Sequence, residues 1–132
     1  MPAFSTDLPS PSLTATQALD LGGLTIRSQR DGDTHVLALS GELDIASASA
    51  VEAELAGVEG AARLARLVID LRDVTFIDSS GLRLVIEANR RAETAAHRFA
   101  LVRPSDRVFR AFQISGIDTL LPFEPADAEA DA

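Results

Sequence analysis

The chain of 132 residues contains no cysteine and no lysine, so all 12 of its basic residues are arginine. Without cysteine there can be no disulfide framework, no thiol nucleophile and no thiolate metal site. Without lysine, the chain lacks the phosphate-binding residue of a Walker motif and the amine of a Schiff base. A receiver-type phosphoaspartate site at Asp78 has little support, because such sites need a lysine and an acidic Mg²⁺ cluster.

Histidine and aromatic residues are scarce as well. The two histidines, His35 and His97, are far apart and fit no metal-ligand spacing. We therefore predict one strand histidine, one histidine at a helix end, and no metal or other cofactor. Six phenylalanines are the only aromatic residues, because tryptophan and tyrosine are missing. The core must be built mainly from Leu, Val, Ile and Ala.

Positive charge is also in short supply, since the net charge is −8 and the isoelectric point is near 4.6. Binding to nucleic acids or to anionic membranes depends on clustered basic residues, so we expect neither partner. No apolar run approaches the roughly 20 residues of a membrane-spanning helix. No basic residue precedes Arg27, whereas a signal peptide begins with positive charge. These features predict a cytoplasmic protein.

Both ends of the chain are polar. Residues 1–23 are rich in Pro, Ser, Thr, Ala and Asp, and residues 124–132 are acidic. Such segments bury too little apolar surface to offset the entropy of ordering. We therefore predict a flexible N-terminal extension, a single domain at residues 24–123, and a flexible acidic C-terminal tail. The hydrophobic fraction of 46% suits one globular domain of this size.

Hydrophobic periodicity predicts an α/β fold. Alternating or short apolar runs predict strands at residues 24–30, 34–40, 67–71, 99–102 and 120–123. Helical spacing predicts helices at residues 45–56, 80–96 and 105–115, with inner faces formed by Ile45, Ala48, Val51 and Leu55 and by Leu82, Val85, Ile86 and Asn89. Asp31-Gly32-Asp33 predicts a hairpin turn, and right-handed crossovers make the later strands parallel. The expected sheet is single and mixed, with four to five strands and with helices in the crossovers.

Polar residues follow two of the strands that are predicted to be parallel. Asp44 ends the first polar segment, and Asp78-Ser79-Ser80-Gly81 forms the second. Because the carboxyl ends of parallel strands share one edge of a sheet, Asp44 and Ser79 should be neighbours. The second segment either caps a helix or holds a nucleophilic serine. The nucleophile has little support, because a Gly-x-Ser-x-Gly elbow is missing and neither histidine is placed as a base.

Three blocks of sequence show a family resemblance. They are Leu39-Ser40-Gly41-Glu42-Leu43-Asp44, then Val68-Ile69-Asp70-Leu71 through Val74-Thr75-Phe76-Ile77-Asp78-Ser79-Ser80-Gly81-Leu82, and finally Val108-Phe109-Arg110-Ala111-Phe112-Gln113-Ile114-Ser115-Gly116-Ile117. In this order and spacing they span nearly all of residues 24–123. On these blocks the chain resembles the STAS family, specifically the anti-sigma factor antagonists of bacterial partner-switching systems.

The resemblance implies a phosphorylation switch and not an enzyme. The first serine of the Asp-Ser-Ser-Gly segment, Ser79, would be the phosphorylation site, with Asp44 beside it. The unphosphorylated protein would bind an anti-sigma factor and release a sigma factor. That anti-sigma factor would itself be an ATP-dependent serine kinase, and a separate serine phosphatase would restore the antagonist. The expected partner-binding residues are Glu42, Asp44, Asp78, Ser80, Gly81 and Arg83, on a protein that is monomeric when free.

Arg83 departs from the family pattern, because antagonists of this kind often carry a small residue at its position. It is either a determinant of the kinase that is bound or a solvated helix arginine. Two other functions stay open beside the phosphorylation switch. One is a STAS scaffold, or the soluble partner of a transporter, without a switch. The other, a small serine hydrolase acting through Ser79 or Ser80, lacks a base and a group to orient it.

Overall fold

The computed structural model describes residues 15–20, 23–61 and 63–124. The strands are β1 (Ala15–Asp20), β2 (Leu24–Asp31), β3 (Thr34–Leu43), β4 (Arg66–Ile77), β5 (Arg98–Val102) and β6 (Phe123–Glu124). The helices are α2 (Ile45–Glu59), α3 (Ser79–Ala95) and α4 (Asp106–Ile114), and a short 3-10 helix, η2, covers Asp118–Leu120.

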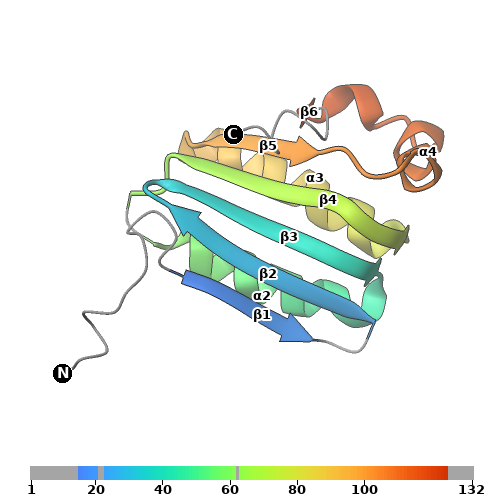
Figure 1. The fold of residues 1–132 in the computed structure, drawn as a ribbon. Helices are drawn as coiled ribbons and strands as arrows, with labels where there is room; N and C mark the ends of the chain where they lie inside the picture. Colours follow the sequence, from blue (N-terminus) through green and yellow to red (C-terminus); the bar gives the residue numbers. More distant parts are fainter. Residues whose placement is uncertain (1–14, 21–22, 62, 125–132) are drawn as a thin grey trace.

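The strands form one sheet in the spatial order β1-β2-β3-β4-β5-β6. The pairs β1–β2 and β2–β3 are antiparallel, whereas β3–β4, β4–β5 and β5–β6 are parallel. Helices α2 and α3 pack side by side behind the sheet, on one of its faces (Figure 1). The predicted α/β fold with a single mixed sheet is therefore confirmed. Helix α2 follows the central strand β3, and helix α3 follows its parallel neighbour β4.

The sheet is wider than the sequence predicted, because it has six strands. Strand β1 lies within the N-terminal segment that was predicted to be flexible, so that prediction is wrong for Ala15–Asp20. An edge strand is held by backbone hydrogen bonds on one side only, so its sequence needs little hydrophobic pattern. The other residues of that predicted extension, apart from Gly23, lie outside the described part of the chain.

The C-terminal boundary also differs from the prediction. The strand expected at residues 120–123 is replaced by η2 and then by β6, which ends at Glu124. Glu124 was placed in the flexible tail, but it pairs with β5 and its carboxylate lies 3.4 Å from the Arg66 guanidinium. The remaining residues of the predicted tail are outside the described part of the chain.

Strand β4 is longer than predicted because it continues past the polar pair Arg72-Asp73 to Ile77. Its pairing with β3 shifts register there, from Ala38 opposite Asp70 to Ser40 opposite Asp73. Such a bulge lets a strand pass polar residues and continue along its partner. As a result, β3 and β4 end together, with Leu43 opposite Ile77.

The main core lies between the sheet and the helices. Its fully buried side chains include Leu37, Leu39, Leu67, Ile69, Leu71, Leu101 and Phe112. Strand residues alternate between faces, so Val68 belongs instead to a small cluster on the opposite face, with Ala100 and Val102. Aliphatic side chains dominate the main core, as the shortage of aromatic residues predicted.

The inner faces of α2 and α3 differ in part from the prediction. On α2, Val51 and Leu55 are buried as expected, but Ile45 is 77% exposed. Ile45 is the first residue of the helix, and its turn projects beyond the end of β3. On α3, the buried residues are Gly81, Leu84, Val85, Ala88 and Ala92. Of the residues predicted to face the core, Val85 is buried, whereas Leu82, Ile86 and Asn89 are only half-buried.

Candidate functional site

The polar segments after β3 and β4 meet at one edge of the sheet, as predicted. The two strands are parallel and end opposite each other, and each is followed directly by an aspartate and a helix. The backbone N–H of Asp78 donates to the carbonyl oxygen of Leu43 at 3.2 Å. The N-termini of α2 and α3 therefore lie next to each other.

Asp78 connects these two helix N-termini. Its Oδ1 accepts hydrogen bonds from the backbone N–H groups of Ser80 at 2.8 Å and Gly81 at 3.2 Å, which caps α3. Its Oδ2 accepts from the backbone N–H of Ile45 at 3.1 Å, in the first turn of α2. One carboxylate thus satisfies N–H groups of two helices that would otherwise lack partners.

Asp44 caps α2 through a capping box. Its Oδ1 accepts from the backbone N–H groups of Ala46 at 3.1 Å and Ser47 at 3.2 Å. The Ser47 hydroxyl accepts from the backbone N–H of Asp44 and donates to the carbonyl oxygen of Glu42. Asp44 therefore has a structural role, and its link to the α3 N-terminus runs through Asp78. Among the described residues, no hydrogen bond joins Asp44 to Ser79.

Ser79 is the first residue of α3, and its side chain is exposed. Within the described ranges its hydroxyl has no hydrogen-bond partner, in contrast to the hydroxyl of the buried Ser47 in the first turn of α2. Ser80 is half-buried behind it. A free hydroxyl at a helix N-terminus is open to reaction, and negative charge added there is favoured by the helix dipole.

Gly81 is buried and packs against the end of β3. A Cβ atom at this position would lie 2.6 Å from Ile77 Cγ1 and 2.8 Å from the Leu43 carbonyl oxygen. No side chain fits there, so Gly81 allows α3 to approach the sheet closely. It supports the predicted binding surface from beneath, whereas Glu42 and Arg83 are exposed on it.

A hollow of about 400 Å³ lies between α2 and α3 next to the free serine. It is lined by Ile45, Ala48, Ser49, Glu52, Ser79, Ser80, Arg83, Leu84 and Glu87. At the same edge of the sheet, Phe76 is 50% exposed and lies opposite Glu42 on the neighbouring strand. Exposed apolar side chains with a charged rim are typical of a protein-binding surface.

Sequence reasoning missed two exposed apolar residues at this edge of the sheet, Ile45 and Phe76. Ile45 was predicted to face the core, and Phe76 was not singled out. The available signal was their position, because each lies within two residues of a capping aspartate at the carboxyl edge. Leu43 and Ile77 are part of the core at this edge, so alternation along β4 turns Phe76 to the opposite face of the sheet. Ile45 follows the capping Asp44 in the first turn of α2 and is exposed.

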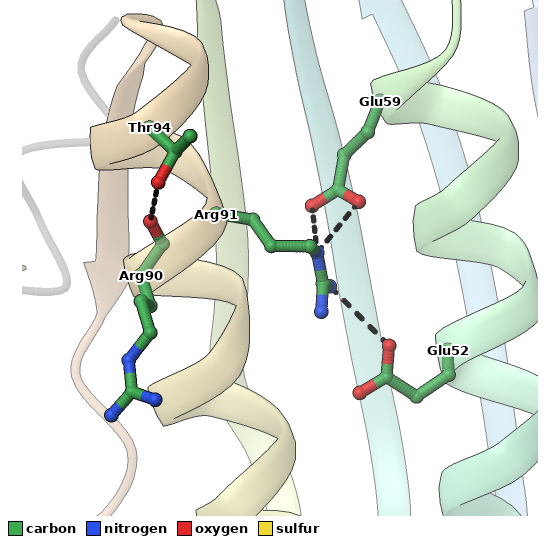
Figure 2. Close-up of polar contacts among 5 residues, drawn as sticks. All are labelled: Glu52, Glu59, Arg90, Arg91 and Thr94. Carbon is green, nitrogen blue, oxygen red and sulfur yellow. Dashed lines mark hydrogen bonds and ion pairs between the residues drawn. The ribbon is translucent and has the colours of Figure 1, made fainter.

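An ion-pair cluster joins α2 to α3 further along the helices (Figure 2). Arg91 of α3 extends toward α2, where its Nε lies 2.9 Å from a Glu59 carboxylate oxygen and its Nη2 lies 3.3 Å from Glu52. Burial alone would lower the pKa of Arg91, but hydrogen bonds and charge attraction from Glu59 and Glu52 raise it. The cluster fixes the spacing of the two helices that flank the hollow.

The histidines lie away from this edge. His35 on β3 is hydrogen-bonded through Nε2 to the hydroxyl of the buried Ser28 on β2, while burial, and then the charge of Arg30, lower the pKa of its imidazole. In the described residues, neither Ser79 nor Ser80 is hydrogen-bonded to a histidine that could act as a base. The predicted strand position of His35 and helix-end position of His97 are both confirmed.

The described part of the chain holds no group of three or more His, Cys, Asp and Glu side chains that could bind a metal ion. Among its helices, none is both long and apolar enough to span a bilayer.

Comparisons with known proteins agree with these features. A family model described as "Mlab, STAS domain" matches residues 26–122. The anti-sigma F factor antagonist of Lysinibacillus sphaericus is 32% identical over 85 residues, which are 64% of this chain and 73% of that protein. The structure of the anti-sigma factor antagonist SpoIIAA in its unphosphorylated form matches with a TM-score of 0.64 and 26% identity, covering 89% of this chain and 94% of that chain. The Bacillus cell fate determinant SpoIIAA in the phosphorylated form matches with a TM-score of 0.59 and 25% identity, covering 89% of this chain and 97% of that chain.

Proposed function

The chain belongs to the STAS domain family, and from this premise we propose that it is an anti-sigma factor antagonist, which binds an anti-sigma factor and so releases a sigma factor. The similarity to named antagonists in sequence and in fold supports this role. We further propose that the antagonist works in the cytoplasm, is monomeric when free, and needs neither nucleic acid nor a membrane.

Phosphorylation of Ser79 is the proposed switch. The observation that carries it is that Ser79 is exposed at the N-terminus of α3 and that its hydroxyl forms no hydrogen bond with any described residue. The anti-sigma factor, acting as a serine kinase, transfers the terminal phosphoryl group of ATP to Ser79 Oγ. The hydroxyl proton is lost and ADP leaves. A serine phosphatase later uses water to restore the hydroxyl and release inorganic phosphate.

The charge of the surface explains why the phosphate would end binding. At the edge of the sheet where Ser79 lies, Glu42 is exposed, and Asp44 and Asp78, which cap α2 and α3, are half-buried. A phosphate on Ser79 adds a charge of about −1.5 to −2 to a surface that is already acidic. A partner that docks over Ile45 and the hollow next to Ser79 removes water from that charge, and desolvation of an unpaired charge opposes binding.

Affinity capture from a lysate of the native host tests the switch. Baits of the wild-type chain and of Ser79→Ala should capture an ATP-binding anti-sigma factor, whereas Ser79→Asp should capture about tenfold less or none, as read by mass spectrometry. Gln113→Glu is a matched control, because it adds one negative charge to an exposed position on α4. It should capture as much as the wild type.

Two outcomes would contradict the proposal. If all the baits capture the same partner equally, Ser79 is only the start of a helix. If that partner is a transporter component, the alternative of a STAS scaffold or transporter partner replaces the switch. Labelling of Ser79 by a serine-reactive fluorophosphonate would instead support the hydrolase alternative.

A further inference from the structure

We propose that Arg83 binds the phosphate on Ser79 within the same molecule, so that one modification both adds an anion to the binding surface and withdraws its cation. The inference rests on the proposed phosphorylation of Ser79. It assigns to Arg83 a role beyond contact with a partner, namely recognition of the modified state.

The two residues are suitably spaced on α3. Ser79 is the first residue of the helix and Arg83 follows at the i,i+4 spacing, where side chains are neighbours on the helix surface. Long side chains in a helix extend toward its N-terminus, so an arginine at position 83 can reach the turn that holds Ser79. Both residues line the same hollow between α2 and α3.

Arg83 is available for this contact. It is exposed, and within the described ranges it forms no ion pair, unlike Arg91 on the same helix. It is also the single cation among the residues that line the hollow, where the charged residues are Glu52, Arg83 and Glu87. A phosphate on Ser79 therefore has one positive charge within reach.

The competing carboxylates are weaker partners for Arg83. Glu87 lies at i+4 on the C-terminal side, which is the less favourable orientation for a carboxylate paired with an arginine, and it lies 4.0 Å from Arg90. Glu52, across the hollow, is paired with Arg91 at 3.3 Å. A phosphate dianion offers more charge than either, and the planar guanidinium can bind two of its oxygens.

A titration of the phosphate tests this assignment. Phosphoserine is incorporated at position 79 of the full chain during translation, and its second pKa is measured by ³¹P NMR in otherwise wild-type, Arg83→Gln and Arg90→Gln proteins. Because Arg83 stabilises the dianion, its loss should raise that pKa by about 0.2–0.4 units above the wild-type value. Arg90→Gln removes the same charge from an exposed position further along α3 and should change it by less than half as much.

Equal shifts in the two variants, or no shift in Arg83→Gln, would overturn the assignment. The titration needs neither a kinase nor a partner, so its failure would leave the capture result standing. A failed capture experiment would likewise leave a measured pKa difference intact.

Discussion

At the scale of single residues, Gly81 shows how an absent side chain can hold a site together. The helix that begins at Ser79 approaches the end of β3 so closely that a Cβ atom would lie 2.8 Å from a backbone carbonyl oxygen. That contact cannot be relieved by rotating a flexible side chain, because one of the partners is backbone. The backbone around the free serine must therefore shift if position 81 carries a methyl group.

We predict that Gly81→Ala lowers the free energy of unfolding by about 1–3 kcal/mol, because the added methyl group overpacks a buried contact. Urea denaturation followed by circular dichroism measures the change. Gly57→Ala is the matched control, since the same methyl group there meets open space on an exposed face of α2. It should raise the free energy of unfolding by about 0.5–1 kcal/mol. Similar effects of the two substitutions would show that packing at Gly81 is not tight.

The caps show how much of the site could be predicted from residues alone. The segment that begins at Asp78 was recognisable as a helix cap, and the parallel strands placed Asp44 at the same edge, but its own role as the cap of α2 was not predicted. The bond from Asp78 to Ile45 could not be predicted, because it depends on β3 and β4 ending opposite each other after a register shift. The polar Arg72-Asp73 pair suggested that β4 ends at residue 71, so the sequence did not predict that β3 and β4 end opposite each other.

At the scale of elements, the pairing of α2 with α3 depends on one arginine. Arg91 reaches across to Glu59, whose side chain is only 15% exposed, and to Glu52, which is 39% exposed. Glu59 would lose its partner in a largely buried place if Arg91 were shortened. The neighbouring Arg90 is 68% exposed and lies 4.0 Å from Glu87 on its own helix.

We expect Arg91→Gln to lower the free energy of unfolding by about 1 kcal/mol, and Arg90→Gln to lower it by less than about 0.5 kcal/mol. The difference arises because exposed ion pairs are screened by water, whereas the Arg91 cluster joins two helices. Chemical denaturation of both variants measures it. A double-mutant cycle with Glu59→Gln should assign most of the loss to the Arg91–Glu59 pair. Equal losses in the two arginine variants would show that the cluster adds no stability.

Element boundaries were predictable where a turn residue or a periodic apolar face marks them. Ser105 starts α4 by accepting a hydrogen bond from Val108, and Gly116 follows its end with a φ of +76°. Strand β1 carries no such mark, because an edge strand needs no apolar face. The buried face of α3 was predicted incorrectly in part, because several consecutive residues of this helix are apolar. Periodicity alone then fits two adjacent faces of the helix equally well.

At the scale of the whole molecule, phosphorylation of Ser79 should leave the fold intact. The serine is exposed and its hydroxyl makes no hydrogen bond among the described residues, so nothing in the core depends on it. The helix dipole favours the added charge by about 0.3–1 kcal/mol, which offsets repulsion from the nearby acidic side chains. Under the proposed switch, the modification would therefore act on binding and not on folding.

Thermal melting checks this expectation. The chain with phosphoserine at position 79 should melt within about 4 °C of the unmodified chain, a difference worth about 1 kcal/mol at most. Gly81→Ala provides the comparison for a change that does disturb this edge of the sheet. A fall of about 10 °C on phosphorylation would mean that the phosphate acts by unfolding the surface instead.

The position of Ser79 on a helix turn fixed to two strand ends has a consequence for any enzyme that modifies it. A linear peptide with the residues around Ser79 would keep the local sequence but lose Asp44, Ile45 and Glu52, which come from another part of the chain. Under the proposed role, a kinase therefore reads a folded surface and not a consensus sequence. A misfolded copy would be neither captured nor phosphorylated, so that only correctly folded molecules take part in signalling.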